Sequence, residues 1–298
     1  MPTIDTESYR ERGYLRLRNF VDRSAIDEIR NDARRVFEFQ MQARGISARA
    51  DAEATESEFE QELFEFFRRD VAGFANCGKQ IQHLISLHRL SLDARIQNVL
   101  RDLGLQFPNI STRPVMFFNS RHLATKEVYW RVFAHQDWRS MQGSLNAVVV
   151  WLPLGNIDRN LGALEIVPGS HRLGLVTTEI IERFGKVDGF QETDFEAVEV
   201  EKGDALFFSA FLVHRSGTNS TEAIRWSCHF RYNDLAESTF ISRGYPHPYL
   251  YQPVEELLTP GFPAREEVER IFAADRDPGK MPRRMNPLRL SSVQECRE

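Results

Sequence analysis

Six short runs of β-branched and aromatic residues follow Phe107, and they constrain the fold of this 298-residue chain more than any other feature. Gly, Pro, Asn and Asp separate the runs, a pattern typical of strands. Because no helical period intervenes, the pattern favours antiparallel sheets closed into a sandwich or jelly roll over a parallel α/β sheet. The runs are STRPVMFFNS, LNAVVVWLPL, ALEIVPGS, EAVEVE, DALFFSAFLVH and IRWSCHFRYND.

The chain before these runs has the apolar spacing of helices. An amphipathic helix is expected from Ser24 to about Ala43, with further helical segments near Gln61–Phe74 and Gly78–Leu105. The stretch Arg49–Phe59 is rich in Ala, Glu, Asp and Ser, so a mobile loop is expected there. The first third is therefore expected to be mostly helical.

The tail from Glu255 to Glu298 contains five prolines around one short helical pattern, EEVERIFAADR, and is expected to wrap the core. The sequence contains no internal repeat, and it has no linker long enough to indicate a second domain. We therefore expect a single domain over residues 1–298: a largely helical flank (1–106), a jelly-roll core (107–235) and a C-terminal cover (236–298). The fold class is mainly β with flanking helices.

The charge balance bears on the class of partner. With 38 basic and 43 acidic residues the net charge is −5, and no long basic run is present. Neither nucleic acid nor an anionic membrane surface is expected as a partner, which leaves a small-molecule substrate. The opening lacks the features of a signal peptide, and no window offers about 18 apolar residues. A cytoplasmic protein is expected, and a homodimer is left open.

The three cysteines, Cys77, Cys228 and Cys296, are far apart and odd in number. This argues against a disulfide framework and against a cysteine-bound zinc ion. Any metal would therefore be held by histidines and carboxylates.

His135 and Asp137 form an H-x-D pair. On an extended backbone, residues i and i+2 point to the same side, so both can reach one ion. His214, at the end of the run DALFFSAFLVH and 79 residues after His135, is the best third ligand. Two imidazoles and one carboxylate leave positions open for a cosubstrate and oxygen. By itself the H-x-D pair is weak evidence for a metal site. A lone histidine at the end of a strand, such as His214, is also more often structural than a metal ligand.

Arg225 strengthens the metal hypothesis. It follows His214 by 11 residues, on the next expected strand. A guanidinium can hold a carboxylate through two parallel hydrogen bonds. An iron centre that binds a dicarboxylic keto acid needs such a counterion.

Four blocks together resemble the phytanoyl-CoA dioxygenase family. They occur in order over roughly Val115 to Asn233, and the opening ESYRERGYLRLRNFVDRSAIDEIR is also similar to that family. The resemblance implies a double-stranded β-helix core, which agrees with the strand pattern, and a dioxygenase that uses Fe(II), 2-oxoglutarate and O2. The blocks are His135-Gln136-Asp137, GALEIVPGSH from Gly162, HRSGTN from His214 and RWSCHF from Arg225.

The resemblance also implies roles for individual residues. His135, Asp137 and His214 would bind Fe(II), and these three are the expected catalytic centre. Arg225 and Ser216 would hold the distal carboxylate of 2-oxoglutarate.

Further residues have weaker expected roles. Trp151 would lie beside the cosubstrate, with a core aromatic as the alternative. Met116 and Asn119 would line the pocket, with core packing favoured for Met116. The segment Gly162 to His171 is expected to shape a turn. His229 is expected to be structural or to support the metal ligands from behind.

Asp137 also bears on the outcome of the reaction. Relatives that halogenate lack the metal-binding carboxylate, so its presence favours hydroxylation of an unactivated C–H bond, with release of succinate and CO2. Two alternatives stay open: a cupin-type enzyme that uses the metal without 2-oxoglutarate, and a catalytically silent jelly-roll binding protein.

Overall fold

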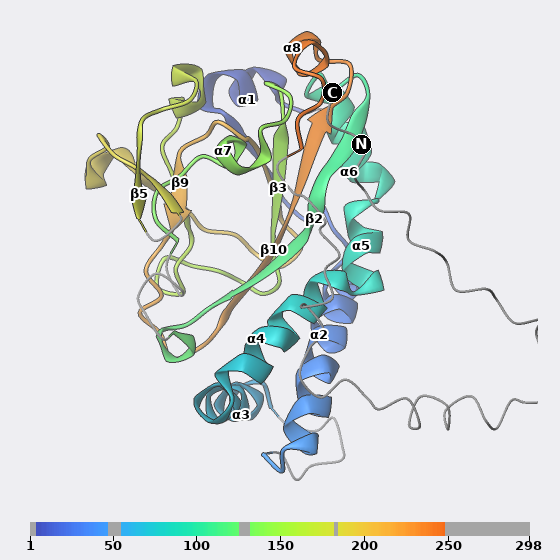
Figure 1. Ribbon diagram of the computed structural model, residues 1–298, viewed down its shortest axis with the longest axis vertical. Helices are drawn as coiled ribbons and strands as arrows, with labels where there is room; N and C mark the ends of the chain where they lie inside the picture. Colours follow the sequence, from blue (N-terminus) through green and yellow to red (C-terminus); the bar gives the residue numbers. More distant parts are fainter. Residues whose placement is uncertain (1–3, 47–54, 125–131, 182–183, 248–298) are drawn as a thin grey trace, which may run out of the picture. The chain divides into compact units, whose positions relative to one another are not determined.

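The computed structural model describes residues 4–46, 55–124, 132–181 and 184–247, in which a helical layer covers one face of a sheet (Figure 1). The predicted mainly β core with flanking helices is confirmed. No helix in these residues is long and apolar enough to cross a membrane. Most of the expected C-terminal cover, including its helical pattern, lies outside them. The helices are α1 (Thr6–Arg12), α2 (Arg23–Ala43), α3 (Glu56–Arg69), α4 (Val71–Gln80), η1 (Ile81–His83), α5 (Ile85–Ser91), α6 (Ala94–Asp102), η2 (Arg121–Leu123), α7 (Trp138–Met141), η4 (Ser170–Leu173), η5 (Glu192–Asp194) and α8 (Ser238–Ser242).

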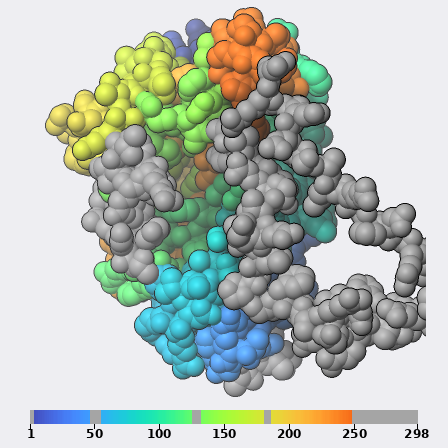
Figure 2. All heavy atoms as spheres, viewed as in Figure 1, coloured from blue at the N-terminus to red at the C-terminus, as the bar shows by residue number. Residues whose placement is uncertain are grey.

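The helical layer buries one stripe of each long helix. In α2 the buried positions are three or four residues apart, which places them on one side. The ring of Phe37, on that side, lies 5.1 to 6.5 Å from those of Phe66, Phe74, Phe118 and Trp226. Figure 2 shows α2 and α3 as adjoining blue and cyan surfaces. The buried α2 residues are Ile26, Ile29, Ala33, Phe37 and Met41.

The start of α3 corrects the expected loop. Thr55 accepts a hydrogen bond from the Glu58 backbone N–H, and the Glu58 carboxylate accepts one from Thr55, which forms a capping box. The helix therefore begins at Glu56, so the prediction of a loop is wrong for residues 56–59. Residues 47–54 lie outside the described residues.

Two sheets make up the core. The larger has the order β1-β8-β3-β10-β2 with every pair antiparallel, and the smaller has the order β7-β4-β9. A separate pair, β5 and β6, was not predicted, and neither was β1. The strands are β1 (Tyr14–Leu17), β2 (Pro108–Asn119), β3 (Val148–Pro153), β4 (Leu164–Ile166), β5 (Thr178–Ile181), β6 (Phe184–Val187), β7 (Glu196–Val198), β8 (Ala205–Ser209), β9 (His214–Ser216) and β10 (Arg225–Asp234).

The run DALFFSAFLVH is two strands rather than the single strand expected. β8 ends at Ser209 in the larger sheet, and β9 begins at His214 in the smaller one. Between them the chain turns, with the Leu212 N–H donating to the Ser209 carbonyl. His214 therefore begins a strand, and this change of sheet brings it to the site described below.

Strand β10 separates the helical layer from a cavity. Successive side chains alternate across a strand. On one side Trp226, Cys228 and Phe230 join the helical core, where Cys228, like Cys77, is a free thiol. On the other side four polar side chains line the cavity, and we call them the β10 polar face: Arg225, Ser227, His229 and Arg231.

Glu60 of α3 is a buried carboxyl at the entry to β10. It is 7% exposed, and its Oε1 accepts the Ile224 backbone N–H at 3.0 Å. Burial raises the pKa of Glu60 to about 7.

A stability prediction follows for Glu60. The carboxyl of Glu60 ionises at a lower pH in the unfolded chain than in the folded chain. The stabilisation that the protonated carboxyl gives the folded chain is therefore present at pH 4 and is lost as the pH rises through 7. We expect Glu60→Gln to match the wild type near pH 4 and to be more stable by about 1 to 3 kcal/mol at pH 8. Urea denaturation at the two pH values measures this, and a difference independent of pH would contradict it.

Candidate metal centre and cosubstrate pocket

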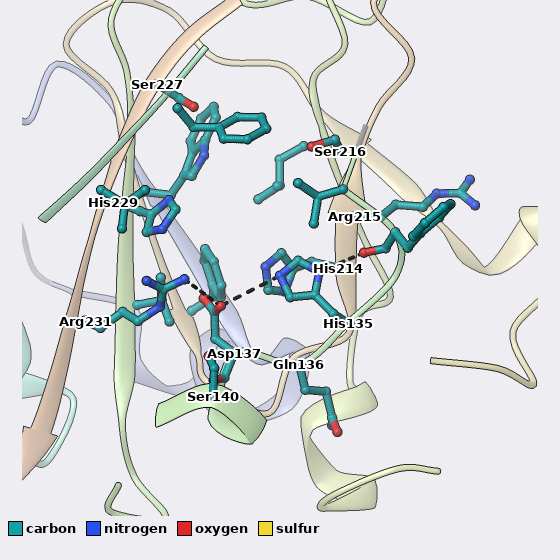
Figure 3. Close-up of a pocket in the computed structure, with 18 of the residues that line it drawn as sticks. His135, Gln136, Asp137, Ser140, His214, Arg215, Ser216, Ser227, His229 and Arg231 are labelled. Atoms are coloured by element: carbon teal, nitrogen blue, oxygen red, sulfur yellow. Dashed lines mark hydrogen bonds and ion pairs between the residues drawn. The ribbon is translucent and has the colours of Figure 1, made fainter. Parts of the chain in front are cut away.

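His135, Asp137 and His214 converge as the sequence predicts. Each offers one ligand atom, and these atoms all lie within 4.8 Å of one another. Among the described residues they form the one group of this kind. Figure 3 shows the three side chains pointing toward one another. Two imidazoles and one carboxylate are the donor set of a non-haem iron(II) site with open positions.

A short bridge between distant segments joins the two histidines. The His135 N–H donates to the His214 carbonyl at 2.9 Å, and the His214 N–H donates back at 3.1 Å. Asp137, however, has φ −63° and ψ −31° and precedes α7. The expected extended geometry for the H-x-D pair is therefore wrong: a turn, not strand alternation, brings Asp137 to the histidines.

Both imidazoles are oriented by backbone carbonyls. The Nδ1 atom of His135 lies 2.8 Å from the Phe133 oxygen, and that of His214 lies 2.9 Å from the Leu212 oxygen. A carbonyl only accepts, so Nδ1 carries the proton and Nε2 keeps its lone pair for a metal. Burial lowers the pKa of His214 to about 4, so its ring is neutral at pH 7.

Arg231 pairs with the carboxylate of Asp137. Its Nη2 donates to Asp137 Oδ1 at 2.9 Å, and both side chains are largely buried. Burial alone would raise the pKa of Asp137, but Arg231 and then the two imidazoles outweigh burial and hold that pKa well below its usual range. Asp137 is therefore ionised and fixed in place before any metal binds.

One cavity of about 580 Å³ contains the triad together with Trp151, Ser216 and Arg225. Arg225 donates from Nη2 to Ser216 Oγ at 3.2 Å and from Nη1 to the carbonyl of Gly162. Gly162 has φ +84°, which agrees with the turn expected there. The cavity volume is within the range of small-molecule sites.

Arg225 is a buried cation without a counterion among the described residues. It is 1% exposed, its Nε has no hydrogen-bond partner, and no carboxylate of the described residues forms an ion pair with it. Burial lowers its pKa to about 10, so it remains charged at pH 7. An unpaired buried charge costs several kcal/mol. A ligand carboxylate in the cavity would compensate it, so the residues present suit an anionic cosubstrate.

Two predicted pocket residues lie elsewhere. Val115 and Phe117 line the metal cavity, so the Met116 side chain points to the opposite face of β2, into the helical core and a second cavity. The pocket prediction for Met116 is wrong because of this alternation. Asn119 is fully buried at the end of β2, opposite Arg225, and it is not among the described residues that line the metal cavity.

Sequence reasoning missed the rest of the β10 polar face. Ser227, His229 and Arg231 all line the cavity, whereas His229 was expected to be structural or to support the metal ligands from behind, and the other two had no expected role. Burial lowers the pKa of His229 well below its ordinary value, so the ring is neutral. The signal was available: positions 225, 227, 229 and 231 alternate on one strand.

Comparisons with known proteins agree with this arrangement. The family described as Phytanoyl-CoA dioxygenase (PhyH) matches residues 9–227. Peroxisomal phytanoyl-CoA dioxygenase of Bos taurus is 28% identical over 239 residues, which cover 74% of this chain and 66% of the bovine protein, just under two thirds of its length. Methylphosphonate hydroxylase of Gimesia maris is 32% identical over 106 residues, 35% of this chain and 40% of that protein.

A solved structure has a similar fold. It is the epimerase SnoN in complex with Fe3+, α-ketoglutarate (2-oxoglutarate) and nogalamycin RO, with 19% identity and a TM-score of 0.51 over 77% of this chain and 82% of that one. The family match runs from the helical flank through the H-x-D pair and His214 to Arg225, and the chain therefore belongs to the phytanoyl-CoA dioxygenase (PhyH) family.

Proposed function

We propose that this chain is an Fe(II)/2-oxoglutarate-dependent dioxygenase that hydroxylates an unactivated C–H bond of a small-molecule metabolite. The observation that carries the proposal is Arg225, a buried cation that has no counterion among the described residues and lies in the same cavity as the His135, Asp137 and His214 triad. A triad alone would suit many metal enzymes. A triad with an unpaired guanidinium suits a metal-chelating acid with a second carboxylate.

Each residue has a role in this proposal. His135 and His214 would hold iron(II) through Nε2, and Asp137 through a carboxylate oxygen. Arg225 and Ser216 would bind the distal carboxylate of 2-oxoglutarate, and Trp151 would pack beside it in the cavity. When bound, the iron and 2-oxoglutarate use O2 to convert the C–H bond to an alcohol, with succinate and CO2 as the other products.

The relatives support the reaction class. The bovine relative is named a dioxygenase and the Gimesia maris relative a hydroxylase. Their substrates are not transferred to this chain, because one fold supports many substrates and the outer walls of the site decide between them. The presence of Asp137 supports hydroxylation over halogenation.

Binding experiments test the proposal without the primary substrate. Adding 2-oxoglutarate to the anaerobic Fe(II) protein should produce a visible absorption band, and calorimetry should detect 2-oxoglutarate binding that requires a divalent metal. In air, slow succinate release should accompany 2-oxoglutarate consumption. Absence of both band and binding would favour the silent jelly-roll protein. Metal-dependent turnover that does not require 2-oxoglutarate would favour the cupin-type enzyme.

A further inference from the structure

The β10 polar face carries a row of buried polar atoms without partners. Four atoms, one from each of its residues, have no hydrogen bond within the described residues. Buried polar groups are nearly always paired, so a row of unpaired ones along a cavity indicates a ligand. The atoms are Arg225 Nε, Ser227 Oγ, His229 Nε2 and Arg231 Nε.

The side chains at the two ends of the row make hydrogen bonds, whereas the two in the middle make none with the described part of the chain. At one end Arg225 donates a hydrogen bond to Ser216. At the other end Arg231 donates one to Asp137. The ends are six residues apart, or about 20 Å along an extended strand. Ser227 and His229 lie between them, so a molecule that reaches from Arg225 to the metal ligands must pass along these two side chains.

The cavity is arranged for such a passage. Figure 3 shows Ser227 and His229 on one wall, across from Ser216, His135 and His214. His229 lies opposite Trp151 on β3 and Val115 on β2, and both of these also line the cavity. With apolar neighbours on both sides, the Nε2 atom of the ring has no hydrogen-bond partner among the described residues.

The most exposed lining residue of the cavity lies near the other end of the row. Ser140, which is exposed, and Arg139, which is half-buried, follow Asp137 and line the cavity there. A primary substrate would enter from this side. The buried Nε2 of His229 is therefore better placed for the cosubstrate, which would occupy the inner part beside Arg225.

We propose that His229 is a positioning residue for the cosubstrate, whose Nε2–H donates a hydrogen bond to the carboxylate adjacent to the keto group of 2-oxoglutarate. This inference rests on the proposed function. Arg225 and Ser216 hold the distal carboxylate, and His229 orients the end that reaches the metal. The hydroxyl of Ser227 lies between the two and contacts the body of the cosubstrate.

Two substitutions of His229 test the hydrogen bond. His229→Phe keeps a ring but removes both nitrogens, whereas His229→Gln keeps an N–H donor at a similar reach. In anaerobic calorimetry of the Mn(II)-loaded proteins, we expect His229→Phe to raise the Kd of 2-oxoglutarate about 10- to 100-fold, as for loss of a hydrogen bond to a charged group. His229→Gln should stay within about 5-fold of the wild type.

The visible band of the Fe(II) protein with 2-oxoglutarate gives a second readout. His229→Phe should shift the band at saturating 2-oxoglutarate, because the chelating end is held differently, and His229→Gln should restore it. Cys228→Ala is the matched control on the same strand: it faces the helical core, so it should leave both the Kd and the band unchanged.

Three outcomes would overturn the inference. The first is a His229→Phe protein with wild-type Kd and band. The second is an equal loss in the Phe, Gln and Cys228→Ala proteins, which would assign the effect to strand packing. The third is a wild type that binds no 2-oxoglutarate with metal present, which would overturn the proposed function itself and is recognised before any variant is compared.

Discussion

The Asp137→Ala protein is expected to lose metal binding, succinate release and about 3 to 5 kcal/mol of folding stability together. Asp137 is 4% exposed and accepts a hydrogen bond from Arg231 at 2.9 Å. Removing one partner of a buried ion pair leaves the other charge uncompensated, which is strongly destabilising. Removing a metal ligand as well should lower turnover at least about 1000-fold, or roughly 4 kcal/mol of barrier.

The double variant Asp137→Ala with Arg231→Met separates the two losses. With both charges gone, much of the stability should return, while metal binding should not. Arg231→Met alone should keep the three ligands but weaken metal binding about 10- to 100-fold, because the carboxylate is no longer oriented. Urea denaturation and Mn(II) calorimetry measure the two effects. A double variant as unstable as Asp137→Ala would contradict the ion-pair argument.

The Arg225→Met protein is expected to show opposite effects on stability and on cosubstrate binding. Without ligand, it should be as stable as the wild type or up to about 2 kcal/mol more stable, because a buried cation without a counterion is replaced by an apolar side chain of similar size. Its affinity for 2-oxoglutarate should fall at least about 100-fold, because the substitution removes a bidentate, charge-assisted contact with the distal carboxylate. Denaturation with and without 2-oxoglutarate measures both.

Arg215→Met is the matched control for this experiment. Arg215 follows His214 on β9 and also lines the cavity, but its charge is already compensated by Glu165 and Glu192. Its replacement should lower stability and change the affinity for 2-oxoglutarate far less than Arg225→Met does. Unchanged 2-oxoglutarate affinity in Arg225→Met would contradict the cosubstrate role of Arg225.

The strand pattern predicted the core well because β-branched runs between turn residues need only local information. The split of DALFFSAFLVH could not be found this way. Ala210, Leu212 and Val213 stay fully buried while the chain passes from one sheet to the other, so the apolar run continues through the turn. Likewise β1 is four residues long and is defined by its pairing with β8, a contact distant in sequence.

The sequence predicted the main residues of the site, but one of the structural arguments behind them was wrong. Residue types and order identified the triad and Arg225, yet the strand argument for Asp137 failed because a turn follows His135. For Met116 the favoured core packing is confirmed and the pocket role is wrong, because its neighbours Val115 and Phe117 occupy the cavity face of β2. His229 required more than alternation: its importance depends on a missing partner, which only the packing of neighbouring strands reveals.

The alternation of β10 also determines where the chain can change in length. Its pairing with β3 runs without interruption from Ser227↔Pro153 to Tyr232↔Val148. Deleting one residue inside β10 would exchange its two faces, placing Trp226 and Cys228 against the metal ligands and charged groups among the aromatic rings. Insertions and deletions should therefore be tolerated at the exposed positions 222 and 223 before β10 but not within the strand.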